Sequence, residues 1–207
     1  MDKNNYSGKL SMTKRREMGL LWVDTGENLN QQVSAMNLCR KFNQTNAEES
    51  EKRKKIWQEL FASCGKDVWI EPPLTLAMGN TVTIGDGTYI NSNLTLVDDY
   101  KISIGKAVLI APNVVISATN HPLHYKLRTR GEMYCKEVTI EDNVWIGSNA
   151  VICAGVTVGM GAVIGAGSVV TRDIPPMCFA AGAPCKVIRQ ITDDDLQEFA
   201  PIPEQNE

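Results

Sequence analysis

The stretch IEDNVWIGSNAVICAGVTVGMGAVIGAGSVVTRDIP, residues 140–175, decides the fold of this chain. A branched apolar residue occupies every sixth position: Ile140, Ile146, Ile152, Val158, Ile164 and Val170. A second set of mostly small or branched residues stands four positions after each of the first: Val144, Ala150, Val156, Ala162, Ser168 and Ile174. A period of six fits neither an amphipathic helix nor an alternating strand, but it is typical of a β-helix. We therefore predict a parallel β-helix in which each hexapeptide forms one face and the coils stack on one another.

The same repeat is present nearer the N-terminus. It reads IGDGTY and INSNLT from residue 84, then IGKAVL, IAPNVV and ISATNH from residue 104, with a shift of two residues near Lys101. It pauses at residues 120–138, the polar insert NHPLHYKLRTRGEMYCKEV. Loops that leave a regular scaffold commonly carry function. This loop contains both histidines of the chain, His121 and His124, so it is the first place to look for chemistry.

The first third of the chain has helical patterns instead. Residues 11–22 and 28–43 place apolar residues at helical spacing. A third helix is predicted between Asn46, which can cap it with Glu49 three residues later, and Gly65. Its apolar stripe consists of Ile56, Trp57, Leu60, Phe61 and Cys64.

These patterns divide the chain into three parts. We expect a helical cap over residues 1–65, the β-helix with its loop over residues 66–191, and a short C-terminal tail over residues 192–207.

Composition excludes several classes of protein. The 207 residues carry a formal net charge of −3, and the one compact basic stretch, EKRKK at residues 51–55, is interpreted as a solvated helix face, so we expect no nucleic-acid partner. No apolar run is long enough for a membrane span, and the N-terminal residues MDKNNYSGKL lack the apolar core of a secretory signal. We therefore expect a cytoplasmic protein. Its six cysteines form no CxxC pair and are interpreted as reduced, mostly buried residues.

Several stretches resemble the hexapeptide-repeat sugar O-acetyltransferases, the family of the galactoside and maltose acetyltransferases. They are EPPLTLAMGNTVTIG (71–85), LIAPNVVISATNHPLHYKLRTRGEMY (109–134), VTIEDNVWIGSNAVICAGVTVG (138–159) and VIGAGSVVTRDIPPMCFAAGAPCKVIR (163–189). The HPLHxxLRxxGEMY pattern of the loop favours the galactoside branch. The resemblance implies a left-handed β-helix and a homotrimer in which acetyl-CoA and the acceptor meet between adjacent subunits, with no metal required.

The resemblance assigns the general base to His121, which also closes a coil at the mouth of the loop. A hydroxyl holds its proton at neutral pH, and imidazole suits its removal because its ordinary pKa lies near the working pH. Asn91 is expected to donate a hydrogen bond to the developing oxyanion. His124 is interpreted as a residue that supports the site or faces solvent.

The family's sugar contacts fall on Asp24, Tyr89, Asn91, Asp99 and Met133. Aspartate and asparagine suit sugar hydroxyls, and an aromatic or methionine wall can cover the apolar face of the ring. Two positions depart from the family pattern. Ala77 replaces a polar residue that touches the sugar in relatives, so one acceptor hydrogen bond is missing, and Asn120 stands where many relatives have Gly or Thr.

The family's coenzyme A contacts fall on Trp145, Ser148, Ala166, Thr171, Arg172, Lys186 and Arg189. The pantetheine arm is expected to run along the solenoid past backbone groups at Ser148 and Ala166. The basic residues suit the phosphates, although Lys186 replaces an arginine and so offers a point charge in place of a bidentate contact.

The sequence therefore predicts an acetyl-CoA-dependent O-acetyltransferase that acts on a galactoside-type hydroxyl by direct attack. Maltose, glucose, an amino acid or an antibiotic remain open as acceptors. A catalytically silent scaffold is a further alternative. A zinc enzyme on the same fold would need three histidines, and the chain has two.

Overall fold

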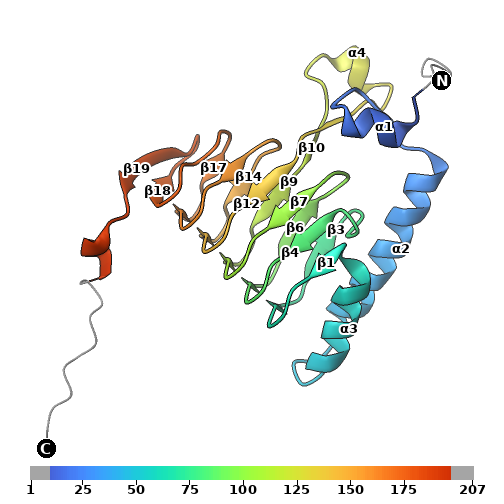
Figure 1. The fold of residues 1–207 in the computed structure, drawn as a ribbon. Coiled ribbons are helices and arrows are strands. Elements are labelled where there is room, and N and C mark those ends of the chain that lie inside the picture. The colour runs from blue at the N-terminus through green and yellow to red at the C-terminus, as the bar shows by residue number, and fades with distance from the viewer. Residues whose placement is uncertain (1–9, 197–207) are drawn as a thin grey trace, which may run out of the picture.

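Each hexapeptide folds as one short strand and one turn, so that three hexapeptides complete a coil. Figure 1 shows the stacked coils of the computed structural model, which describes residues 10–196. Within those residues the coil strands form three parallel sheets, here named faces 1, 2 and 3 in the order in which the chain visits them. The predicted parallel β-helix is therefore confirmed.

Face 1 contains β1 (Ser63–Cys64), β4 (Val82–Ile84), β7 (Ile102–Ile104), β12 (Val138–Ile140) and β15 (Thr157–Val158). Face 2 contains β2 (Trp69–Ile70), β5 (Tyr89–Ile90), β8 (Leu109–Ile110), β13 (Trp145–Ile146), β16 (Val163–Ile164), β18 (Cys178–Ala181) and the antiparallel β19 (Lys186–Gln190). Face 3 contains β3 (Leu74–Leu76), β6 (Leu94–Val97), β9 (Val115–Ser117), β14 (Val151–Ile152) and β17 (Val169–Val170).

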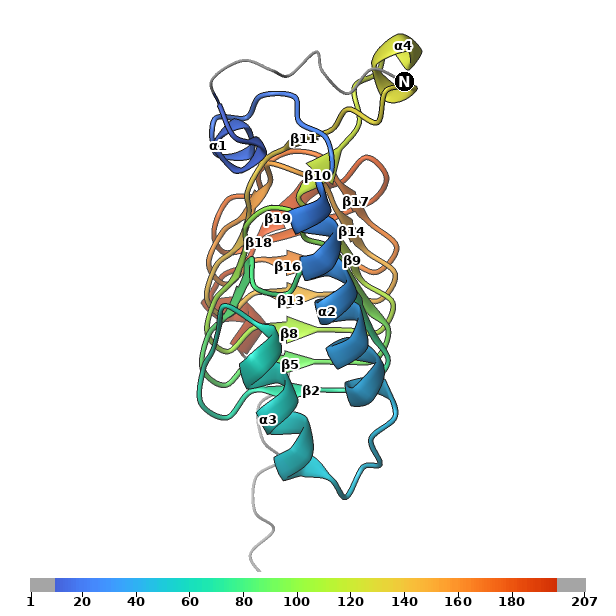
Figure 2. The same ribbon diagram turned by 90° about the vertical axis from the view of Figure 1, so that its right-hand side faces the viewer.

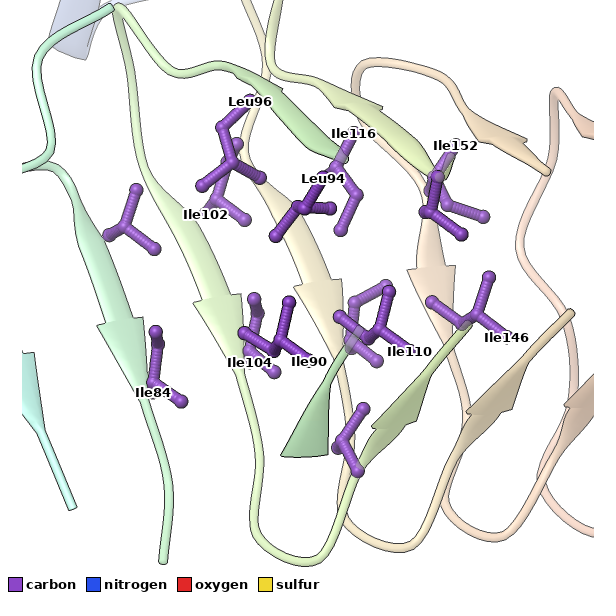
Figure 3. Packing of buried hydrophobic residues seen from close by; sticks show 14 of the residues in the cluster. Ile84, Ile90, Leu94, Leu96, Ile102, Ile104, Ile110, Ile116, Ile146 and Ile152 are labelled. Carbon is purple, nitrogen blue, oxygen red and sulfur yellow. The ribbon is translucent and has the colours of Figure 1, made fainter. Parts of the chain in front are cut away.

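The six-residue repeat places its apolar residues in columns inside the solenoid. Residues three repeats apart pair across adjacent coils: Ile140 with Val158, Ile146 with Ile164, and Ile152 with Val170. Figure 3 shows the same stacking for Ile90, Ile110 and Ile146 on face 2. These side chains are at most 1% exposed. Burying such a side chain contributes about 1.5–3 kcal/mol, so the columns supply most of the stabilisation between coils.

Tight corners allow the coils to approach each other. A Cβ added to Gly147 would lie 2.6 Å from the backbone nitrogen of Ala166 in the next coil, so only glycine fits there. Gly167 has a φ of +69°, a conformation that other residues adopt only with strain.

The two-residue shift near Lys101 lies at the corner between faces 3 and 1, called here the 3–1 corner. Asp98 fills this enlarged corner and accepts hydrogen bonds from three successive backbone N–H groups, of Ala77 (2.7 Å), Met78 (3.1 Å) and Gly79 (2.6 Å). The Thr81 hydroxyl donates to the same carboxylate at 2.8 Å. Burial raises the pKa of Asp98, against the effect of these donors.

Replacing Asp98 with alanine is expected to destabilise the protein by about 3 kcal/mol, because three backbone N–H groups lose their acceptor, those of Met78 and Gly79 being buried and that of Ala77 partly buried. Chemical denaturation followed by circular dichroism measures this loss. The matched control is Asp86→Ala, which removes an exposed carboxylate that accepts from Lys66 N–H at 2.8 Å, and which should cost less than about 1 kcal/mol. Equal losses in the two variants would contradict a structural role specific to Asp98.

Helices close the N-terminal end of the solenoid. Figure 2 shows α2 (Gly26–Asn43) and α3 (Ser50–Leu60) lying across the first coil, where α2 contacts β3 and α3 contacts β1. Phe42 and Trp57 join the two helices with an edge-to-face ring contact at 5.9 Å. The shorter α1 (Met12–Glu17) precedes them.

The third helix is shorter than the sequence predicts. It begins at Ser50 with Glu49 as N-cap, although the Glu49 carboxylate does accept from Asn46 N–H at 2.7 Å, as in a capping box. It ends at Leu60, and Cys64 lies in β1 of the solenoid.

The predicted loop leaves the 3–1 corner after β9. It contains β10 (Thr119–Asn120), α4 (Tyr125–Arg128) and β11 (Tyr134–Cys135), and β11 returns antiparallel to β10. Beyond β19 the chain forms a 3₁₀ turn at Asp193–Leu196, and the rest of the predicted tail, residues 197–207, lies outside the described residues. Over residues 10–196, no helix is both long and apolar enough to cross a membrane.

Candidate active site

His121 directly follows β10, at the root of the loop. Its Nδ1 lies 2.8 Å from the backbone carbonyl oxygen of Glu132. A carbonyl oxygen can only accept, so Nδ1 carries the proton in this contact. The neutral ring then presents an unprotonated Nε2, the form that a general base requires.

Two carboxylates, Asp24 and Asp99, lie near the same corner. Asp99 is buried, and its Oδ1 accepts from the side-chain amide of Gln32 at 3.2 Å. Burial and the charge of Asp99 raise the pKa of Asp24, while Arg16 and a hydrogen bond from Gln32 act against this increase. Among the described residues, nothing hydrogen-bonds to Oδ1 of Asp24, which leaves an unused acceptor at this corner.

Arg16 organises this cluster and is buried, with an exposed fraction of 8%. It donates to the backbone carbonyl of Asp99 at 3.0 Å, and its guanidinium lies 5.1 Å from the ring centroid of Trp22. Trp22 in turn pairs with Met133 of the loop through two backbone hydrogen bonds of 2.9 Å. His121, Asp24, Asp99 and Met133 are thus brought together at the 3–1 corner.

The remaining residues that are predicted to bind the acceptor sugar lie elsewhere. Tyr89 is on β5 of face 2, and Asn91 follows at the corner between faces 2 and 3, called here the 2–3 corner. Asn91 Oδ1 accepts from Ser92 N–H at 2.7 Å, and the part of the chain that the structure describes offers no partner to its Nδ2. The amide therefore keeps a free donor. The 2–3 and 3–1 corners are separated by the length of one face, on the order of 15 Å.

Most of the predicted coenzyme A residues follow face 2 and the 2–3 corner. Trp145 is in register with Leu109 and Tyr89, and all three side chains are exposed, with fractions of 51%, 50% and 36%. Ser148 and Ala166 stack at the 2–3 corner, where the Ser148 carbonyl accepts from Gly167 N–H at 2.8 Å.

Backbone groups at this corner are available to a ligand. Residue Ala166 is exposed, and no described residue accepts from its N–H. An extended chain containing amide groups, such as pantetheine, can bind such groups without any particular side chain. For binding such a ligand, the small size of the side chain at residue 166 then matters more than its chemical type.

The predicted phosphate contacts lie near the C-terminal end. Lys186 and Arg189 are on β19, while Thr171 and Arg172 follow β17 at the 3–1 corner, and all four are exposed. Arg189 forms a two-point ion pair with Asp195 at 2.9 and 2.6 Å, which lowers the pKa of Asp195 to about 2. A phosphate would therefore compete with Asp195 for this guanidinium.

Several contributors were not predicted from the sequence. Arg16, Trp22 and Gln32 stand in segments that were interpreted only as helical, and the Glu132 group that holds His121 is a backbone carbonyl. No sequence motif indicates that a buried arginine contacts the corner that carries the aspartates. Within residues 10–196, no group of three His, Cys, Asp or Glu side chains is arranged to hold a metal ion.

Comparison with known families supports the pattern of repeats and cap. Residues 137–172 match the family model for the bacterial transferase hexapeptide of six repeats, and residues 25–65 match that for the maltose acetyltransferase hexapeptide capping motif. The galactoside O-acetyltransferase of Escherichia coli (strain K12) is 49% identical over 191 residues, covering 92% of this chain and 94% of that protein.

Solved structures resemble the whole solenoid with its cap. A galactoside acetyltransferase in complex with coenzyme A has a TM-score of 0.88 at 46% identity, covering 91% of this chain and 94% of that one. A maltose O-acetyltransferase from Clostridium difficile 630 has a TM-score of 0.87 at 37% identity, covering 89% of this chain and all of the other (100%).

Proposed function

The chain belongs to the hexapeptide-repeat acetyltransferase family, and from that premise we propose that it transfers the acetyl group of acetyl-CoA to a hydroxyl group of a galactoside-type sugar. The 49% identity to a galactoside O-acetyltransferase supports this acceptor class over maltose. The observation that carries the chemistry is the hydrogen bond from His121 Nδ1 to the Glu132 carbonyl, because it leaves Nε2 free to accept a proton. A silent scaffold would not need this arrangement.

In the proposed reaction, the acceptor hydroxyl gives its proton to Nε2 of His121 while its oxygen bonds to the thioester carbonyl carbon. The former carbonyl oxygen becomes negative and accepts a hydrogen bond from Nδ2 of Asn91. When the C–S bond breaks, the carbonyl re-forms and the sulfur of coenzyme A takes the proton from the imidazolium. The thioester is already activated, so no covalent enzyme intermediate is required.

The two halves of the proposed site lie at different corners of one chain, so His121 and Asn91 act together only if they come from adjacent copies. We therefore propose a homotrimer in which the 3–1 corner of one copy faces the 2–3 corner of the next. The exposed apolar column of Tyr89, Leu109 and Trp145 supports this arrangement, since isolated monomers rarely leave such a column in water. Coenzyme A would then bind along the 2–3 corner, beside Ser148 and Ala166.

An assay with a panel of acceptors tests the proposal. Purified protein is incubated with acetyl-CoA and a galactoside, glucoside, maltose, serine or chloramphenicol, and release of the coenzyme A thiol is followed. The expected result is the highest kcat/KM with a galactoside. Preference for serine or chloramphenicol would overturn the acceptor class, and absence of thiol release with any acceptor, together with no binding of acetyl-CoA by calorimetry, would overturn the proposed activity.

A further inference from the structure

His121 is oriented by one peptide unit, the one that joins Glu132 to Met133. The carbonyl of this unit accepts from His121 Nδ1 at 2.8 Å. Its N–H, which belongs to Met133, donates to the carbonyl oxygen of Trp22 at 2.9 Å. A trans peptide unit is planar, and its C=O and N–H point in opposite directions. The direction of the carbonyl that holds His121 is therefore set by Trp22 on the opposite side.

Trp22 is itself firmly held. Its side chain has no exposed surface, and its indole N–H donates to Sγ of Cys135 at 3.2 Å. Cys135 lies on β11 opposite Thr119 of β10, and Thr119 stands two residues before His121. The Cys135 sulfur also contacts the Thr119 hydroxyl at 3.5 Å. The Cys135 sulfur thus links the Trp22 indole to both strands at the root of the loop, the returning strand β11 and the strand β10 that leads into the base. Burial raises the pKa of the Cys135 thiol, so the sulfur stays protonated and remains a neutral acceptor.

We propose that Trp22, through its contact with Cys135, is a positioning residue for the general base. It fixes the peptide unit that selects the Nδ1–H tautomer of His121, and no contact of Trp22 with substrate is involved. This inference rests on the proposed role of His121.

Loss of the indole contact has a specific chemical consequence. A peptide unit that is free to tilt no longer offers its carbonyl to Nδ1, and the neutral ring then also populates the Nε2–H tautomer. That tautomer cannot take the proton of the acceptor hydroxyl at Nε2. The turnover number falls, whereas KM for acetyl-CoA is unchanged because Ser148 and Ala166, which are proposed to bind the pantetheine arm, lie at the 2–3 corner.

Histidine-selective ¹⁵N NMR tests the inference directly, because the chain has two histidines and His124→Gln assigns their signals. The variants are Trp22→Phe, which keeps a ring but loses the indole N–H, Cys135→Ala, which loses the sulfur, and Cys135→Ser, which keeps an acceptor. Trp57→Phe is the matched control, a buried tryptophan of the helical cap that is 4% exposed. Circular dichroism confirms that each variant is folded.

Wild type is expected to show His121 with the proton on Nδ1. Trp22→Phe and Cys135→Ala are expected to add the Nε2–H form and to lower kcat by about 10-fold, a part of the 10²- to 10⁴-fold effect of a general base. The double variant should lose no more than either single variant, because both remove the same contact. Cys135→Ser and Trp57→Phe should resemble wild type.

An unchanged tautomer in folded Trp22→Phe and Cys135→Ala would overturn the inference, and so would an equal loss of kcat in Trp57→Phe. The NMR measurement does not depend on turnover. A tautomer shift in a protein that acetylates no acceptor would therefore retain the positioning by Trp22 and overturn the proposed function alone.

Discussion

Replacing His121 with alanine is expected to lower kcat by about 10²- to 10⁴-fold while KM for acetyl-CoA stays within about twofold, because general-base catalysis acts on the transition state and not on binding. The side chain is exposed at the root of the loop, and Nδ1 makes the one hydrogen bond that the ring has within residues 10–196. Removing it leaves no large cavity. The melting temperature and the oligomer mass should therefore remain those of wild type.

His124→Ala is the matched control for this variant. His124 lies three residues further along the loop, stacks on Tyr125 at 5.3 Å, and accepts from Lys126 N–H at 3.3 Å as the N-cap of α4. Its loss should change kcat by less than about threefold, because an exposed cap affects local stability more than chemistry. Steady-state kinetics on both variants compares them, and an unchanged rate in His121→Ala would rule out the base mechanism.

The solenoid could be predicted from the sequence because its core is a property of spacing. Residues three repeats apart, such as Ile146 and Ile164, must share a column once each repeat forms one face. The third helix was predicted too long for a related reason. Cys64 continues the helical spacing, but Gly65 N–H and Ala62 N–H pair with the carbonyls of Ile84 and Val82 in the next coil. Ladder hydrogen bonds with the solenoid outweigh local periodicity there.

The surroundings of His121, the proposed base, could not be predicted in the same way. Its partner is the backbone carbonyl of Glu132, and the N–H of that peptide unit donates to the backbone carbonyl of Trp22, so neither accepting atom belongs to a side chain that a motif could record. The role of Asp98 also needed coordinates. Its carboxylate binds three N–H groups of the neighbouring corner, whereas the sugar contact predicted for Asp99 from the resemblance stays a prediction.

Asn91→Ala is expected to lower kcat by about 10²- to 10³-fold, the usual effect of removing one oxyanion donor. Its Oδ1 bonds within its own turn at 2.7 Å, so the loss of a structural contact is confined to Ser92 N–H at the solenoid surface. KM for acetyl-CoA should change little. A variant with full turnover would exclude Asn91 as the donor.

The same variant tests whether the site lies between copies. Asn91→Ala and His121→Ala, each nearly inactive alone, are co-expressed with different affinity tags, and mixed trimers are purified through both tags. In a site that is shared between copies, His121 comes from one copy and Asn91 from the next. A trimer that carries both tags has a 2:1 or 1:2 composition, and in either case one of its three interfaces pairs an intact His121 with an intact Asn91, so about a third of the sites regain activity. A site contained in one chain would regain none.

Mixed trimers of His121→Ala with Asp99→Ala provide the negative control for this experiment. Both residues belong to the 3–1 corner, and Arg16 and Trp22 link them within a single chain through the Asp99 carbonyl and Met133. No pairing of these two variants assembles an intact corner, so kcat/KM measured below the acceptor KM should stay at the level of the variants alone. If activity returns in the first mixture and not in the second, the 3–1 corner of one chain and the 2–3 corner of the next form one site. Equal restoration in both mixtures would mean that His121 and Asp99 do not share a corner in the working enzyme.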